Sequence, residues 1–214
     1  MTFQEHTYKR RQMLASHWTI EDMVYGAIGS KTAEGKNGVR HAINSHFKQN
    51  DAGYPDALPK TVEMIRDNWH SIITPHPADF EELYARVEEL ILDSIKGVGL
   101  LTTYDIALNI GCNIYPKVLP EKKVYLHYNC VYKSAINLIG IGNIDSHIVD
   151  IEKFKDKLPH FSAMEIEDIL CIYHREITKG TFSLISLDRI PSKLENVYFK
   201  NRCNAIAIQE INNN

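Results

Sequence analysis

The 214-residue chain lacks most of the residue spacings that mark metal-binding, disulfide-linked or membrane-spanning proteins. Its four cysteines are scattered with no close pairing, which excludes a zinc knuckle or a CxxC redox site and predicts reduced, partly buried thiols. Its ten histidines form no HxH or HExxH spacing, so we predict no metal site. No run of about 18 apolar residues is present, and the N-terminal stretch lacks the apolar core of a secretory signal. We therefore expect a cytoplasmic protein that does not bind membranes.

Familiar catalytic fingerprints are also missing, and so is a strong net charge. The sequence has no Walker-type loop, dinucleotide fingerprint or nucleophile elbow. A net charge of −3 gives no global attraction to nucleic acid, so any such binding must depend on a local patch. The charge is uneven along the chain, because residues 1–60 hold eight basic and six acidic residues whereas residues 61–96 hold three basic and eight acidic ones.

The residues that are present predict a mainly α-helical fold. A hydrophobic content of 44% and a charged content of 24% are typical of a folded globular chain. Apolar residues recur at three- and four-residue steps over 79–95, which is the strongest helix prediction. A second helix is expected from Leu101 to Ile110 and should be closed by Gly111, and Ser162 with Glu165 has the spacing of a capping box. Short strands are expected near 123–127 and in the C-terminal tail.

Three regions follow from this pattern. Residues 1–60 read as an N-terminal helical and loop region, residues 61–180 as a helical core, and residues 181–214 as a tail that packs on the core. The length suits one domain with a small appendage, since domains usually contain about 100–200 residues.

The segment Ile95-Lys96-Gly97-Val98-Gly99 joins the two central predicted helices. Two glycines flanking one apolar residue permit a turn tight enough to direct backbone N–H groups at a phosphate. A tight corner in which the glycines only allow close helix packing is the structural alternative. The adjacent Lys96 favours the phosphate interpretation, whereas the apolar residues at 100 and 101 weaken it.

This segment resembles the helix-hairpin-helix element, in which an apolar residue, Gly, an apolar residue and Gly are followed by three variable residues and a small residue. Thr103 stands where that family usually has alanine. The resemblance implies that the hinge amides and the start of the second helix hold a nucleic-acid phosphate without reading sequence, often with a bound monovalent cation and no other cofactor. The predicted partner is therefore nucleic acid, foremost DNA. The predicted contact residues are Lys96, Gly97, Val98, Gly99 and Thr102, with Lys36, Arg40, His41 and Lys48 of the basic 31–48 region.

The resemblance extends to helix-hairpin-helix DNA glycosylases, whose hairpin is followed by a Val-Asp-x-His/Asn-Val segment. Residues 124–128 have a similar shape, but Tyr125 replaces the catalytic aspartate, and Leu101 replaces the lysine of bifunctional glycosylases. Ordinary glycosylase activity is therefore not expected. The span 95–173 is also similar to a group of uncharacterised bacterial and phage-type proteins, which implies a shared fold and no particular activity.

Two alternative functions remain open from the sequence. The first is an enzyme acting on a nucleotide or nucleic acid. Its catalytic candidates Tyr125, His127, Glu167 and Asp168 would meet, together with Cys171 and Tyr173, if the 162–173 helix packs beside the hairpin. The non-catalytic interpretation of the same residues places Glu167 and Asp168 on a solvated helix face and Cys171 on the buried side. The second alternative is a protein-interaction module whose acidic helix, with Glu81, Glu82, Glu88 and Glu89, docks a partner.

Overall fold

The protein is mainly α-helical, as the sequence predicts, with a single two-stranded sheet in the part of the chain that the structure describes. The structure is a computed structural model that describes residues 2–5, 7–8, 18–28, 56–127 and 129–190. The chain forms two compact units that separate after Val118, which lies within the predicted 61–180 core. Among the described helices, none has the length and apolarity needed to cross a membrane.

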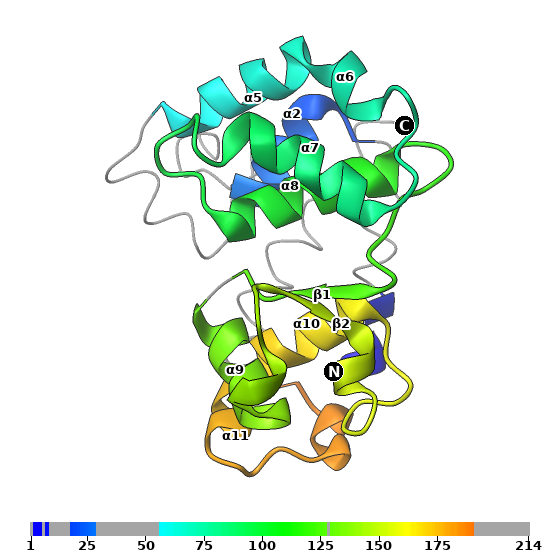
Figure 1. Cartoon of the computed structure of the whole chain (residues 1–214), viewed down its shortest axis with the longest axis vertical. Helices are drawn as coiled ribbons and strands as arrows, with labels where there is room; N and C mark the ends of the chain where they lie inside the picture. The colour runs from blue at the N-terminus through cyan, green and yellow to red at the C-terminus, as the bar shows by residue number, and fades with distance from the viewer. Residues whose placement is uncertain (1, 6, 9–17, 29–55, 128, 191–214) are drawn as a thin grey trace, which may run out of the picture. The chain divides into compact units, whose positions relative to one another are not determined.

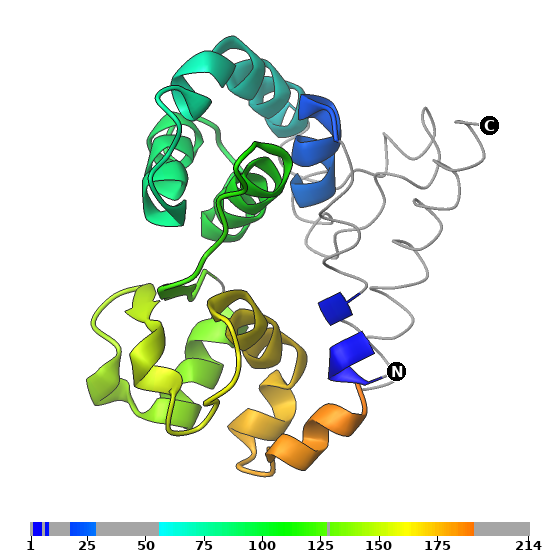
Figure 2. The ribbon, with the colours of Figure 1, turned by 90° about the vertical axis from the view of Figure 1, so that its right-hand side faces the viewer.

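The first unit, here called the hairpin unit, contains the described residues of 18–28 and 56–118. Its helices are α2 (Ile20–Ile28), α5 (Ala57–Asp67), α6 (Trp69–Ile73), α7 (Phe80–Ile91) and α8 (Leu100–Asn113). Helix α8 packs against both α2 and α7, and α5 packs against α2 and α7 (Figures 1 and 2). Because α8 lies between two helices, most of its residues from Thr103 to Cys112 are buried.

The caps of these helices follow from their sequences. The Thr19 hydroxyl accepts a hydrogen bond from the Asp22 N–H at 3.2 Å, and the Asp22 carboxylate accepts one from the Thr19 N–H at 3.2 Å. Asp79 caps α7 by accepting from the Glu82 N–H at 3.0 Å. Helix α7 ends at Ile91, four residues before the predicted end, because the chain turns there toward the hinge.

Gly111 does not end α8, so the predicted closure at this residue is wrong. The helix continues to Asn113, and the chain then turns back so that the Val118 N–H donates to the Gly111 carbonyl at 2.9 Å. A Cβ atom at Gly111 would lie 2.0 Å from the Val118 carbonyl oxygen. Glycine is therefore required here by the close approach of another backbone segment rather than by a helix terminus.

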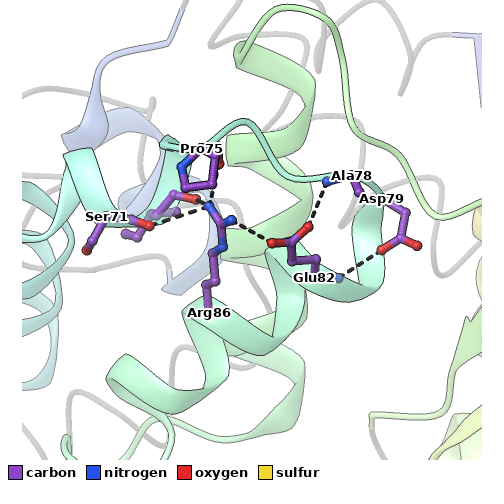
Figure 3. A network of polar contacts seen from close by, with 7 residues as sticks. Ser71, Pro75, Ala78, Asp79, Glu82 and Arg86 are labelled. Atoms are coloured by element: carbon purple, nitrogen blue, oxygen red, sulfur yellow. Dashed lines mark hydrogen bonds and ion pairs between the residues drawn. The ribbon is translucent and has the colours of Figure 1, made fainter.

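Arg86 holds the chain after α6 against α7, as Figure 3 shows. Its Nη1 donates to the carbonyl oxygens of Ile72 at 2.7 Å and Pro75 at 2.8 Å, and its Nη2 pairs with Glu82 Oε1 at 2.6 Å. The other oxygen of Glu82 accepts from the Ala78 N–H at 2.8 Å.

The hydrogen bond from the Ala78 N–H is the largest cause that holds the pKa of Glu82 below its ordinary value, and the contact with Arg86 is the second. The stabilisation from Glu82 is thus present above about pH 4.5 and is lost as the pH falls through the lowered value.

Replacing Arg86 should destabilise the hairpin unit more than replacing an exposed arginine. We expect Arg86→Met to cost about 1.5–3 kcal/mol, because the carbonyls of Ile72 and Pro75 lose a charged donor while most of the side-chain volume is kept. Arg66, whose ion pair with Glu21 is solvent-exposed, is the control. Arg66→Met should cost less than about 1 kcal/mol. Urea unfolding followed by circular dichroism measures both changes, and equal effects would contradict the anchoring role.

The second unit, here called the sheet unit, contains the described residues of 2–8 and 119–190. Strands β1 (Lys123–Tyr125) and β2 (Ile148–Asp150) pair antiparallel with Val124 opposite Val149. The helices are α9 (Asn129–Ile139), α10 (Ala163–Ile172) and α11 (His174–Thr178), with short 3₁₀ turns η2 (Ile141–Asn143), η3 (Ile151–Phe154) and η4 (Leu184–Asp188). The short strand predicted near 123–127 is thereby confirmed at Lys123–Tyr125.

Helix α10 is the central element of the sheet unit. It packs against α9, α11 and β1, and nearly all of its residues are buried. The predicted capping box is present, with the Ser162 N–H donating to Glu165 Oε2 at 2.9 Å. Phe3 from the N-terminal segment packs on Phe161 and Tyr173 at ring distances of 5.9 and 6.2 Å. Of the tail in which strands were predicted, residues 184–188 form η4, and residues 191–214 lie outside the described residues.

Candidate functional site

The hinge between α7 and α8 is a tight turn made possible by Gly97. Gly97 has φ +98°, a left-handed conformation that favours glycine, and Gly99 is extended with φ −126°. Between them the Val98 side chain is buried, and its N–H donates to the Ile95 carbonyl at 3.1 Å. The prediction that the Val98 amide takes part in the phosphate grip therefore needs correction. Val98 anchors the turn in the core of the hairpin unit.

Helix α8 begins directly after this turn, with exposed Gly99 at its N-cap position. The first intrahelical bond runs from the Thr103 N–H to the Gly99 carbonyl at 3.0 Å, and Gly99, the N-cap residue, supplies no side-chain cap. The N–H groups of residues 100–102 precede that bond and have no acceptor within the helix. A Cβ at Gly99 would meet no atom within 4 Å, so the space beside this helix terminus is open.

The other predicted contact residues differ in exposure. Lys96 is exposed, Leu101 and Thr102 are partly exposed, and Thr103 is fully buried with its hydroxyl donating to the Gly99 carbonyl at 3.1 Å. Thr103, which stands at the small-residue position of the helix-hairpin-helix pattern, therefore packs in the core of the hairpin unit. The predicted contacts Lys36, Arg40, His41 and Lys48 lie outside the described residues.

Two of the four catalytic candidates meet in the sheet unit. His127 Nε2 lies 3.0 Å from Glu167 Oε1, and the two side chains are 3% and 6% exposed. His127 follows β1, and Glu167 lies on the buried face of α10, so the packing of that helix on β1 brings them together. A pair enclosed to this degree offers little surface to a substrate. Its first role is to connect α10 to the segment after β1.

The remaining candidates are also buried. Tyr125 and Asp168 are 2% and 5% exposed, so the placement of Glu167 and Asp168 on a solvated helix face is wrong. The reason is that α10 is covered by neighbours on several sides, which its own sequence does not reveal. Burial also raises the pKa of Tyr173 above its ordinary value, which keeps that phenol protonated.

Sequence reasoning did not connect Cys130 with Cys171. The Cys171 side chain is the main cause that lowers the pKa of Cys130. Burial and the Glu167 charge oppose the shift, while the Val131 N–H and His127 support it. The available sequence signal was the spacing, since Cys171 follows Glu167 by four residues on one helix and Cys130 follows His127 by three.

Two acidic side chains of helix α7 make contacts with other residues of the same helix. Glu82 bonds with Arg86, and Glu88 Oε1 accepts from the Tyr84 hydroxyl at 3.0 Å. Glu81 is half-buried and Glu89 is exposed. A test of the interaction-module alternative should therefore reverse Glu81 and Glu89, and leave Glu82 and Glu88 in place.

No family model, curated protein or solved structure matches this chain. The similarity of the hinge to helix-hairpin-helix elements, and of the span 95–173 to bacterial and phage-type proteins, therefore stays a prediction from the residues quoted above. Within the described segments, no group of three or more His, Cys, Asp or Glu side chains is arranged to hold a metal ion.

Proposed function

We propose that the protein binds nucleic acid, foremost DNA, through its backbone and without sequence specificity, at the turn between α7 and α8. The observation that carries the proposal is the exposed, uncapped N-terminus of α8, which follows immediately after the left-handed turn at Gly97. The resemblance of this segment to helix-hairpin-helix elements supplies the ligand class.

The physical basis is the attraction between a phosphate and a helix N-terminus. The N–H groups of residues 100–102 have no acceptor within the helix, and the macrodipole of a 14-residue helix adds about half a positive charge there. A phosphate oxygen supplies the missing acceptors. Gly99 lets a sugar-phosphate backbone approach closely, because a side chain at this position would occupy the open space beside the helix.

The residues around the helix terminus explain why the expected binding is weak and nonspecific. Lys96 places one exposed positive charge at the turn, whereas Leu100 and Leu101 in the first turn of α8 offer no groups that read a base edge. Buried Val98 holds the turn in place. Binding of this kind depends on contacts with phosphates, so the affinity must fall as the salt concentration rises.

Charge reversal at the turn is the direct test. We expect Lys96→Glu to weaken binding of a fluorescent DNA duplex about tenfold at low salt, and to reduce the salt slope by about one. Lys117→Glu is the matched control, because exposed Lys117 lies near the other end of α8, a helix about 21 Å long. Fluorescence anisotropy over a salt series measures both. Equal losses for the two variants would reject the turn as the contact site.

A gain-of-function variant separates binding from folding. Leu101→Lys adds a cation at a partly exposed position in the first turn of α8, where the bifunctional glycosylases that this segment resembles carry lysine. We expect tighter binding and a salt slope steeper by about 0.9. If the wild-type chain showed no affinity for duplex or single-stranded DNA at about 50 mM salt, or no salt dependence, the proposed function would be wrong.

A further inference from the structure

The hairpin unit contains a cavity of about 390 Å³ between α5, α6 and the C-terminal half of α7. This volume lies within the range of about 300–1,000 Å³ that is typical of small-molecule sites. All of the lining residues belong to the hairpin unit, and none of them is a predicted phosphate contact of the turn after α7. A ligand in this cavity is therefore bound independently of DNA at that turn.

Three helices contribute apolar side chains to the lining. Met64 comes from α5, Ile72 from α6 and Leu90 from α7. Ile72 is buried, and the other two are half-buried. A hydrocarbon chain that enters the cavity is removed from water against these side chains, and the gain grows with the apolar area that it covers. The lining thus favours a ligand with an apolar body.

The exposed polar side chains of the lining favour a ligand that donates hydrogen bonds. Ser71 Oγ already donates its hydrogen to the Asn68 carbonyl at 2.9 Å, so this hydroxyl has only lone pairs left for a ligand. Glu89 is an exposed carboxylate with no side-chain hydrogen bond or ion pair to another of the described residues. An ionised carboxylate accepts hydrogen bonds and donates none.

Arg86 also lines the cavity, but its charge is compensated within the fold. Its Nη2 pairs with Glu82 Oε1 at 2.6 Å, and its Nη1 donates to the carbonyl oxygens of Ser71 at 3.4 Å and Ile72 at 2.7 Å (Figure 3). These bonds hold α6 against α7, so two of the helices that carry the lining are in place before a ligand arrives. The uncompensated charge of the lining is the negative charge of Glu89.

We propose that this cavity binds a small organic ammonium ion that carries a short apolar chain. The ammonium group pairs with Glu89 at the exposed mouth and donates to the Ser71 hydroxyl oxygen. The chain covers the apolar side chains contributed by α5, α6 and α7. An ammonium group has donors only, which matches these acceptors, whereas a carboxylate would place a second negative charge beside Glu89.

Ligands of equal length and opposite charge test the proposal. The full-length protein, labelled with ¹⁵N, is titrated with n-hexylammonium chloride and followed by amide chemical shifts. We expect saturable shifts concentrated at residues 64, 71–72, 89–90 and 94. Hexanoate should bind at least about tenfold more weakly because its charge is repelled. Methylammonium should also bind at least about tenfold more weakly, because it lacks the chain.

Two variants at the mouth assign the roles of charge and space. Glu89→Gln should weaken n-hexylammonium binding about threefold, as expected for loss of an exposed ion pair. Glu63→Gln, which removes an exposed carboxylate of α5 outside the lining, is the matched control and should leave the affinity unchanged. Ser94→Phe places a large side chain at an exposed lining position and should weaken binding at least about tenfold by filling the cavity.

A further ligand distinguishes the two sources of an organic ammonium group. N-acetyl-lysine methylamide carries the group on a peptide backbone, and n-butylammonium carries it on a free chain of equal length. Binding of the lysine derivative at least as tight as that of the amine would assign the site to a lysine side chain of a partner protein. Weaker binding would assign it to a free amine, and both results support an ammonium site.

Three results would overturn the proposal. They are hexanoate binding as tightly as n-hexylammonium, equal affinities for Glu89→Gln and wild type, and shifts spread over all acidic residues of α7 rather than over the lining. The amide spectrum of each variant without ligand shows whether it is folded before affinities are compared. The titrations contain no nucleic acid, so their outcome is separate from that of the DNA-binding test.

Discussion

Gly111→Ala is expected to destabilise the hairpin unit by at least about 3 kcal/mol, although alanine is the better helix former. The new Cβ would lie 2.0 Å from the Val118 carbonyl oxygen and 3.1 Å from Leu83 Cδ2. To relieve the overlap, the returning chain must move and give up the hydrogen bond from the Val118 N–H to the Gly111 carbonyl. Chemical denaturation measured by circular dichroism gives the change in unfolding free energy.

The sign of the change in unfolding free energy distinguishes two explanations for the glycine at position 111. If Gly111 were an ordinary helix residue, alanine would stabilise the protein by about 1 kcal/mol. Gly99→Ala in the same helix is the matched control, because a Cβ there meets nothing within 4 Å. It should cost about 1 kcal/mol or less, as expected for an N-cap position. A stabilising Gly111→Ala would show that the chain near Val118 does not pack against α8.

Removing one partner of the His127–Glu167 pair should have the second large effect. We expect His127→Leu to cost about 3–5 kcal/mol, because the Glu167 carboxylate stays buried and loses the histidine that lies 3.0 Å away. The double variant His127→Leu/Glu167→Leu removes both polar groups and should recover at least half of that loss. Hydrogen exchange of α10 peptides reports on the sheet unit directly.

An exposed ion pair in the same unit is the control for the comparison of the single and double variants. Lys123 Nζ lies 3.2 Å from Asp150 Oδ2 across β1 and β2, and both side chains are at least one third exposed. Lys123→Ala should cost less than about 1 kcal/mol. If His127→Leu were equally mild, or the double variant were as unstable as the single one, the pair would not be the buried connection that its geometry indicates.

Gly111 and the His127–Glu167 pair also show which features local sequence rules do not predict. The local rules predicted the capping box at Ser162 and the short strand near residue 123, because each depends on neighbours within a few positions. Gly111 has the sequence signature of a helix end. The approach of Val118 that explains it results from the path of the chain beyond the helix.

The candidate sites divide in the same way. Gly97, Val98 and Gly99 could be recognised from their order in the sequence, since a left-handed turn before a helix requires a glycine at a fixed position. The role of Val98 could not, because its burial and the use of its N–H by Ile95 depend on how the turn sits against the hairpin unit. Glu167 and Asp168 were placed on a solvated face because the number of neighbours around α10 is a tertiary property.

The sequence by itself determined the helical class, the helix starts and the glycine turn between α7 and α8, since these arise from periodicity, capping and backbone sterics over a few residues. Tertiary structure alone decided that Gly111 lies inside a helix and that His127 meets Glu167 across 40 residues of chain. The physical reason is that burial and long-range contact depend on which faces pack together, and residue spacing within one helix does not specify its partner.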